Sequence, residues 1–213
     1  MQTFIEEYDK YYSSRKFDRL GLFKLLNATY NIQKVLYLGS HIHITPSLVF
    51  PEVVYIDSYE KFKQMIESQE ASTFIQNNKQ YQAIPKYTFI KQNYDDYLDI
   101  DIDFDLLISQ YAGFVSQAGK KHLKNGGILV ANNSHGDATM AYLDRDFELI
   151  AVADQPRDKW RLSDKQLNDY LVRKDGNVDS KTELLKTGKG PGYIKSASCY
   201  IFQYKCNRMH GDK

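Results

Sequence analysis

The sequence has very little cysteine and no long hydrophobic run. Cys199 and Cys206 are the only cysteines among its 213 residues. This number is too small for a disulfide framework and is typical of a reducing compartment such as the cytoplasm. No apolar run approaches the roughly 20 residues that a membrane-spanning helix needs. The acidic N-terminus, residues 1–7, lacks the basic-then-apolar order of a signal peptide. We therefore expect a cytoplasmic protein without a membrane partner.

The sequence also lacks an excess of charge of either sign. Its 28 Lys and Arg residues nearly balance 27 Asp and Glu residues, which gives a formal net charge of +1. Nucleic acid is therefore a less expected partner, because a strongly basic surface is the usual electrostatic signature of such binding. Hydrophobic residues make up 42% of the chain, which is enough for a sizeable core. The length suits one domain of ordinary to large size.

The distribution of apolar residues predicts a sheet of buried strands. Five short apolar runs are rich in β-branched residues, and such runs are typical of strands that are buried on both faces. The runs span residues 35–38, 53–56, 87–90, 104–108 and 127–131.

Helical patterns separate most of these runs. Ser58 is a candidate N-cap for a helix that reaches toward Ile75, residues 112–124 form a second helix, and Ser134 or Asp137 opens a third. Strands that alternate with helices favour right-handed crossovers and parallel pairing. The predicted fold class is therefore α/β, with a three-layer, Rossmann-like, mainly parallel sheet.

The two ends of the chain depart from this alternation. Residues 1–33 show helical spacing and form a predicted N-terminal helical cap. Residues 147–153 and 196–204 indicate two strands that pair antiparallel at the sheet edge. The polar stretch between them is too long for a hairpin turn, so we expect an inserted segment. Within this segment, residues 163–172 form a predicted helix. The predicted boundaries are 1–33 for the cap, 34–206 for the α/β domain with its insertion at 154–193, and 207–213 for a tail.

Four motifs in this order and spacing resemble those of class I S-adenosylmethionine-dependent methyltransferases. Residues 35–40, Val-Leu-Tyr-Leu-Gly-Ser, resemble the first motif, a strand that ends in a glycine turn. Residues 54–57, Val-Tyr-Ile-Asp, resemble the second motif, whose terminal acid accepts hydrogen bonds from the cofactor ribose. Residues 93–98, ahead of the strand at 104–109, are similar to the adenine-contacting turn. Residues 123–130 are similar to the glycine-containing approach to the fifth strand.

The resemblance covers about residues 34–153 and 194–204. It implies S-adenosylmethionine as the cofactor and methyl transfer to an acceptor, a small molecule or a protein, that the sequence does not identify. The implied cofactor-binding residues are Gly39, Ser40, His41, Asp57, Ser58, Asn93, Tyr94, Ser109 and Gln110. The implied catalytic candidates, close to the expected mouth of the pocket, are Tyr111, His135 and Asp137.

The sequence departs from the family pattern after its first strand. Only Gly39 stands where the family usually has two or three glycines, and residues 41–43, His-Ile-His, occupy the rest of the loop. A second hypothesis is therefore a non-catalytic binding or scaffolding module with the same fold. Residues 109–112 lack the Asn/Asp-Pro-Pro-Tyr motif of methylases that act on amino groups of nucleic acid or glutamine. The absence of Gly-x-Gly-x-x-Gly disfavours NAD.

Each candidate residue also has a purely structural interpretation. Gly39 serves as a tight turn in that case, Asp57 caps the following helix, and His135 and Asp137 belong to a solvated capping loop. His41 and His43 have no third ligand at matching spacing, so we predict no metal site. In the inserted segment, Trp160 lies among basic residues and either contacts an acceptor or partner, or anchors the segment to the core.

Overall fold

The chain divides into two compact units, Met1–Ile100 and Asp101–Lys213. The structure is a computed structural model that describes residues 3–100 and 103–206. The predicted tail at 207–213 lies outside the described residues. The residues of the predicted helical cap belong to the first unit. There α1 (Phe4–Tyr8) contacts α4 (Gln69–Asn78), and α2 (Leu20–Tyr30) contacts the 3-10 turn Thr45–Leu48.

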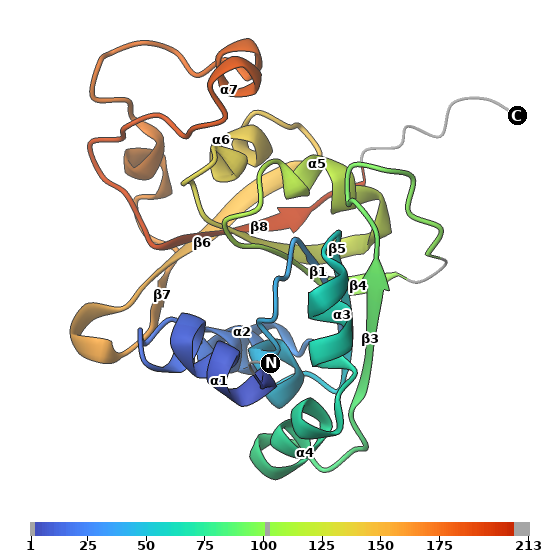
Figure 1. Cartoon of the computed structure of the whole chain (residues 1–213). Helices are drawn as coiled ribbons and strands as arrows, with labels where there is room; N and C mark the ends of the chain where they lie inside the picture. Colours follow the sequence, from blue (N-terminus) through green and yellow to red (C-terminus); the bar gives the residue numbers. More distant parts are fainter. Residues whose placement is uncertain (1–2, 101–102, 207–213) are drawn as a thin grey trace, which may run out of the picture. The chain divides into compact units, whose positions relative to one another are not determined.

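The described residues of the first unit form three parallel strands (Figure 1). They are β1 (Lys34–Leu38), β2 (Glu52–Asp57) and β3 (Lys86–Lys91), with β2 between the other two. Leu36 pairs with Val54 and Leu38 with Ile56, and all four side chains are buried. The apolar runs in the sequence therefore predicted these strands correctly. Parallel pairing in this register brings the carboxyl ends of β1 and β2 together, where the N–H of Gly39 donates to the Ile56 carbonyl at 2.8 Å.

The helices of the first unit are shorter than the sequence predicts. The pattern from Ser58 toward Ile75 forms two helices, because Ser68 caps the second one by accepting from the N–H of Ala71 at 3.1 Å. Tyr59 takes the N-cap position that was predicted for Ser58. The helical elements are α1 (Phe4–Tyr8), a π-helical turn (Asp9–Ser13), α2 (Leu20–Tyr30), a 3-10 turn (Thr45–Leu48), α3 (Glu60–Ile66) and α4 (Gln69–Asn78).

In the second unit, residues 103–206 form five strands in the order β4-β5-β8-β6-β7. Only β4 and β5 are parallel, and the remaining neighbours are antiparallel. The two long strands that were expected to pair antiparallel are β6 and β8, and they do so, with β8 between β5 and β6 (Figure 1). The edge is formed by β7, which the sequence did not predict. The bounds are β4 (Phe104–Ser109), β5 (Leu123–Ala131), β6 (Phe147–Asp154), β7 (Arg161–Ser163) and β8 (Cys199–Tyr204).

Two predicted helices of the second unit need correction. The helix expected at 112–124 is limited to α5 and a 3-10 turn, because β5 already begins at Leu123 and pairs there with Phe104. The helix expected at 163–172 is wrong over its first part, where Ser163 pairs with Val152 of β6. The helical elements are α5 (Val115–Gly119), α6 (Asp137–Tyr142), α7 (Lys181–Thr187) and 3-10 turns at Lys120–His122, Pro156–Asp158 and Leu167–Leu171.

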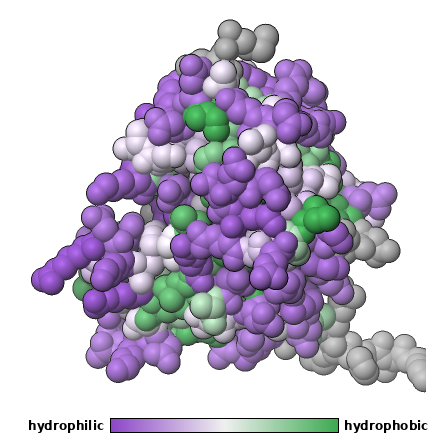
Figure 2. Space-filling view, turned by 90° about the horizontal axis from the view of Figure 1, so that it is seen from below, coloured by the Kyte–Doolittle hydropathy of each residue, from purple (hydrophilic) through white to green (hydrophobic). Residues whose placement is uncertain are grey.

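The surface shown in Figure 2 is mostly hydrophilic, and its hydrophobic residues form separate patches. Within residues 3–100 and 103–206, no helix has both the length and the apolar character that crossing a membrane requires.

A buried histidine lies at the centre of the first unit. His43 is 2% exposed, and its ring stacks on that of Tyr12 with a centroid distance of 4.3 Å. Its Nε2 donates to the Asp18 carbonyl at 2.8 Å, and its Nδ1 accepts from the Tyr37 hydroxyl at 3.0 Å. Burial lowers the pKa of His43 to about 3, because a charged imidazolium would lose its hydration there.

We predict that acid destabilises the protein through His43. Its pKa is lower in the folded state than the usual 6.5, so its stabilising contribution is complete above about pH 6.5 and falls as the pH drops toward 3. Between pH 6.5 and 5 the loss is up to about 2 kcal/mol. Urea unfolding at several pH values measures it. The His43→Gln variant should be less stable at pH 7.5, but its free energy of unfolding should change less with pH. The exposed control His135→Gln should keep the pH dependence of the wild type. Equal slopes in all three proteins would contradict the prediction.

Candidate functional site

Asp57 lies at the carboxyl end of β2 and holds the loop that follows β1. Its Oδ2 accepts from the N–H of His41 at 2.9 Å, and its Oδ1 accepts from the N–H of Tyr59 at 3.1 Å. Gly39, at the start of this loop, has φ of 65°, which glycine adopts without strain. Asp57 is half-buried and the neighbouring Ser58 is exposed. Each carboxylate oxygen has capacity for a second hydrogen bond, so Asp57 still has acceptor capacity for a ligand.

His41 occupies the loop position after Gly39 and Ser40 in a left-handed conformation, with φ of 52°. Its ring packs edge-on against Phe62 and Tyr11, with centroid distances of 4.2 and 4.9 Å. Its Nδ1 forms a hydrogen bond with the Tyr12 hydroxyl at 2.7 Å, and burial lowers the pKa of His41. The imidazole is therefore held by side chains from the N-terminal helical elements and α3.

The other loop side chains in the first unit have structural contacts. Ser40 is buried and donates to the His41 carbonyl at 3.2 Å. Asn93, after β3, forms a local turn in which its Oδ1 accepts from the N–H of Asp95 at 3.2 Å. Asn93 is exposed and Tyr94 is half-buried. Within the described residues no group of three or more His, Cys, Asp or Glu side chains could hold a metal ion.

In the second unit, Asp137 is buried and its oxygens accept several hydrogen bonds. The hydroxyls of Ser109 and Ser116 each donate to it at 2.5 Å, and the N–H of Ser116 donates at 3.0 Å. Burial raises the pKa of Asp137 to about 6, and the hydrogen bonds act in the opposite direction. This arrangement corrects the interpretation of Asp137 as part of a solvated capping loop. It favours a structural role for both Asp137 and Ser109.

Gln110 follows Ser109 and points into the interior of the second unit. Its Nε2 donates to the Cys199 sulfur at 3.7 Å. Its Oε1 is buried and has no hydrogen-bond partner in the part of the chain that the structure describes. Cys199, at the start of β8, is buried.

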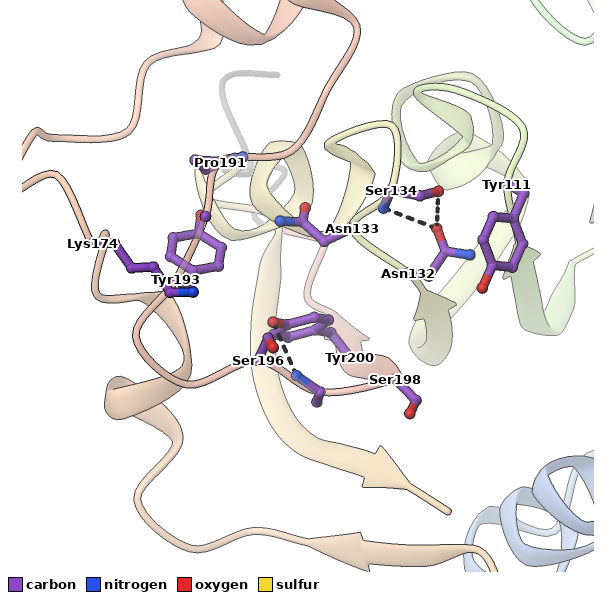
Figure 3. A pocket seen from close by; sticks show the side chains of 12 residues that line it. Tyr111, Asn132, Asn133, Ser134, Lys174, Pro191, Tyr193, Ser196, Ser198 and Tyr200 are labelled. Carbon is purple, nitrogen blue, oxygen red and sulfur yellow. Dashed lines mark hydrogen bonds between the residues drawn. The ribbon is translucent and has the colours of Figure 1, made fainter. Parts of the chain in front are cut away.

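A pocket of about 370 Å³ lies at the carboxyl ends of β4 and β5 in the second unit (Figure 3). Tyr111 contributes to it from the β4 side, with φ of 62°, unusual for a tyrosine. His135, the other catalytic candidate, is exposed and does not line the pocket. The lining residues are Tyr111, Asn132, Asn133, Ser134, Lys174, Pro191, Gly192, Tyr193, Ser196, Ala197, Ser198 and Tyr200.

Asn132 follows β5 and has one unused donor. Its Oδ1 accepts from the N–H of Ser134 at 3.3 Å and from the Ser134 hydroxyl at 2.9 Å. Its Nδ2 is buried and has no hydrogen-bond partner among the described residues. Asn132 was not among the predicted site residues, although it directly follows the apolar run at 127–131. Which atom of the Asn132 amide has a partner depends on the conformation of the loop after β5, so the sequence alone does not show it.

The inserted segment, 154–193, forms one side of the pocket. The Tyr193 hydroxyl donates to Asp179 at 2.7 Å, and its oxygen lies 2.7 Å from the Thr139 hydroxyl oxygen. Thr139 is anchored in turn, because its N–H donates to Asn133 Oδ1 at 3.0 Å. The segment is thus fastened to the loop after β5, and Lys174 and Tyr193 reach the lining from it.

Comparisons with known proteins find similarity in structure only. No protein-family model matches the chain, and no curated protein matches it. The N-methyltransferase NodS from Bradyrhizobium japonicum, solved in complex with S-adenosyl-L-homocysteine, matches with a TM-score of 0.51 and 11% identity, over 89% of this chain and 86% of that chain. A putative O-methyltransferase from Klebsiella pneumoniae has a TM-score of 0.49 and 10% identity, over 68% and 77% of the two chains. An rRNA methylase from Streptococcus thermophilus has a TM-score of 0.47 and 12% identity, over 86% of this chain and 94% of that chain.

The similarity to NodS shows the fold. The chain has the Rossmann-like α/β fold of S-adenosylmethionine-dependent methyltransferases, with parallel strands, an antiparallel edge and N-terminal helices, as the sequence predicted. At 11% identity the similarity carries no information on substrate or activity.

We predict that Gly190 is required for docking of the inserted segment. A Cβ at this position would overlap the backbone oxygen and side chain of Asn133. Gly190→Ala should therefore lower the free energy of unfolding by about 1–3 kcal/mol and expose residues 172–195 to protease. Gly192→Ala is the matched control, since its Cβ would meet only Lys174 Cδ at 3.9 Å, an ordinary contact. Equal stability and equal cleavage rates for the two variants would refute this role.

Proposed function

We propose that the protein is an S-adenosylmethionine-dependent methyltransferase. The observation that carries the proposal is Asp57, a partly exposed carboxylate at the end of β2, beside the Gly39 turn, in a chain with a methyltransferase fold. In NodS the fold is accompanied by bound S-adenosyl-L-homocysteine, and this observation about NodS supports the same class of ligand here.

The residues of the first unit fit the ribose of such a cofactor. Asp57 accepts one hydrogen bond at each oxygen from the backbone, and each oxygen has capacity for a hydroxyl donor. Gly39 and Ser58 flank it at the same strand ends, and Asn93 and Tyr94 follow β3 as candidates for adenine contacts. His41 contributes its ring in place of the missing glycine, and this ring is fixed by Tyr12 and Phe62.

The second unit provides the candidate acceptor pocket. S-adenosylmethionine supplies an electrophilic methyl group on a positively charged sulfur. The protein's tasks are to hold an acceptor nucleophile in line, to exclude water and, for a protonated nucleophile, to take up a proton. Tyr111 is the catalytic candidate that lines the pocket, and Asn132 is an additional candidate for orienting the acceptor. Ser109 and Gln110, also expected near the cofactor, are buried at the end of β4.

A second candidate function is a binding or scaffolding module that has lost methyl transfer. The observation that favours it is the left-handed His41, whose ring fills part of a loop that other methyltransferases leave to glycine. Tyr11, Tyr12 and Phe62 prevent this ring from moving freely. Calorimetry with S-adenosylmethionine and S-adenosylhomocysteine separates the two functions, because micromolar binding supports the enzyme and no binding to either supports the module.

We predict that Asp57 contributes directly to cofactor affinity. Asp57→Ala removes the acceptors for the ribose hydroxyls and should weaken S-adenosylhomocysteine binding by about 1–3 kcal/mol, on the order of 5- to 150-fold. Asp57→Asn keeps one accepting oxygen and should lose less. Isothermal titration calorimetry measures both affinities.

Glu52→Gln is the matched control, since Glu52 lies at the opposite end of the same strand. It should bind S-adenosylhomocysteine as the wild type does. If Asp57→Ala has wild-type affinity and an unchanged circular dichroism spectrum, Asp57 does not belong to the cofactor site.

A further inference from the structure

The N-terminal helical elements and α3 hold the imidazole of His41 in one orientation. The Tyr12 hydroxyl forms a hydrogen bond with its Nδ1 at 2.7 Å, and Phe62 and Tyr11 pack edge-on against the ring. The backbone N–H of His41 donates to the Asp57 carboxylate at 2.9 Å. Because the ring and this N–H belong to one residue, the imidazole lies near Asp57, whose charge acts on it. A free polar atom of this ring is therefore placed to contact a ligand that binds Asp57.

The Tyr12 hydroxyl determines which ring nitrogen of His41 carries the hydrogen. Tyr12 is 7% exposed, and Nδ1 is the only hydrogen-bond partner of its hydroxyl among the described residues. An O–H turned away from Nδ1 would be a buried donor without an acceptor, which native proteins rarely contain. The hydroxyl therefore donates to Nδ1. Burial lowers the pKa of His41 below its ordinary 6.5, although the charges of Asp57 and Glu7 act in the opposite direction, so the ring is neutral at pH 7. A neutral imidazole whose Nδ1 accepts carries its hydrogen on Nε2.

The Nε2–H group of His41 is available to a ligand. His41 is half-buried, and its Nε2 makes no hydrogen bond to any residue that the structure describes. Nε2 is also not one of the fully buried side-chain atoms without a partner, so it is accessible to solvent. A fixed N–H donor thus lies near a carboxylate with unused acceptor capacity. A hydroxyl both donates and accepts, so a vicinal diol fits this pair, with one hydroxyl donating to Asp57 and an oxygen of the diol accepting from Nε2–H.

We propose that Tyr12 is a positioning residue, which fixes His41 so that its Nε2–H donates to a ribose hydroxyl oxygen of a nucleoside bound at Asp57. The ligand class is a nucleoside with free 2′- and 3′-hydroxyls. This inference rests on the proposed function, because ribose enters the site as part of the cofactor. Glycine, which has no side chain, cannot supply such a donor. The imidazole thus adds affinity, whereas an obstructing ring would lower it, and the two cases give opposite effects when the ring is removed.

The contribution of His41 is tested by calorimetry with S-adenosylhomocysteine and its 2′,3′-dideoxy analogue. His41→Gly removes the ring and keeps the backbone N–H, and glycine adopts the observed φ of 52° without strain. The variant should bind S-adenosylhomocysteine about 2- to 12-fold more weakly, the range for one hydrogen bond. Its affinity for the dideoxy analogue should equal that of the wild type. Unchanged or tighter binding of S-adenosylhomocysteine, or an equal loss for both ligands, overturns the proposal.

The role of Tyr12 is tested by nuclear magnetic resonance spectra of the imidazole nitrogens. In the wild type, the His41 signals should show a protonated Nε2 and an unprotonated Nδ1. Tyr12→Phe should raise the fraction of rings that are protonated at Nδ1 and weaken S-adenosylhomocysteine binding, by no more than His41→Gly does. Tyr8→Phe is the matched control, because it also removes a buried hydroxyl, but one that contacts Thr45. It should keep the tautomer and affinity of the wild type. A wild-type ring that is protonated at Nδ1 alone overturns the role of Tyr12.

Failure of this proposal is distinguishable from failure of the proposed function. A wild-type protein that binds neither ligand overturns the proposed function and, with it, this role of His41. If the wild type binds S-adenosylhomocysteine and His41→Gly binds it equally well, only the role of His41 and Tyr12 is overturned.

Discussion

The carboxylate of Asp137 is the interaction on which the second unit's pocket depends. It accepts from Ser109 at the end of β4 and from the N–H and hydroxyl of Ser116 in α5, and it is itself the first residue of α6. These bonds hold the strand end two residues before Tyr111 and the helix that follows the Asn132 loop. An acid buried in this way is stabilised only while its donors remain in place. These bonds therefore position the part of the pocket lining that lies at the ends of β4 and β5, while the inserted segment is held by its own contact with Thr139.

Asp57 holds a loop of the first unit in a comparable way, but it is less buried than Asp137. It holds the loop after β1 through the N–H of His41, yet it is partly exposed and has unused acceptor capacity. Its backbone contacts orient the carboxylate before any ligand arrives, which reduces the entropic cost of binding. This arrangement requires a left-handed conformation at His41, the third residue of the loop. Aromatic neighbours hold His41 in that conformation.

The sequence predicted the strands far better than the helices and the site. Each apolar run became a strand. In β1, β2 and β4 burial on both faces accounts for the continuous apolar residues, whereas in β3 only Phe89 is buried. The three-residue strand β7 has no such run and is half-exposed, so nothing in its composition distinguishes it from a loop. The helix at 112–124 ended early because pairing of Leu123 with Phe104 competes with local helix propensity. Tyr111 was a predicted site residue that lines the pocket, but Asn132 was not predicted, and neither was Lys174.

By itself, the sequence determined the strand positions, the polar character of the strand ends and the α/β fold class, because these depend on local patterns of burial. Only the tertiary structure decided which polar residues have partners. Asp137 and Asn132 both stand after β5, yet Asp137 is saturated by Ser109 and Ser116, whereas Asn132 has an unused donor. The difference arises from residues more than 20 positions away and from the docking of the segment at 154–193. Hydrogen bonds are directional and short, so their pairing follows from distances between distant segments, which residue spacing along the chain does not specify.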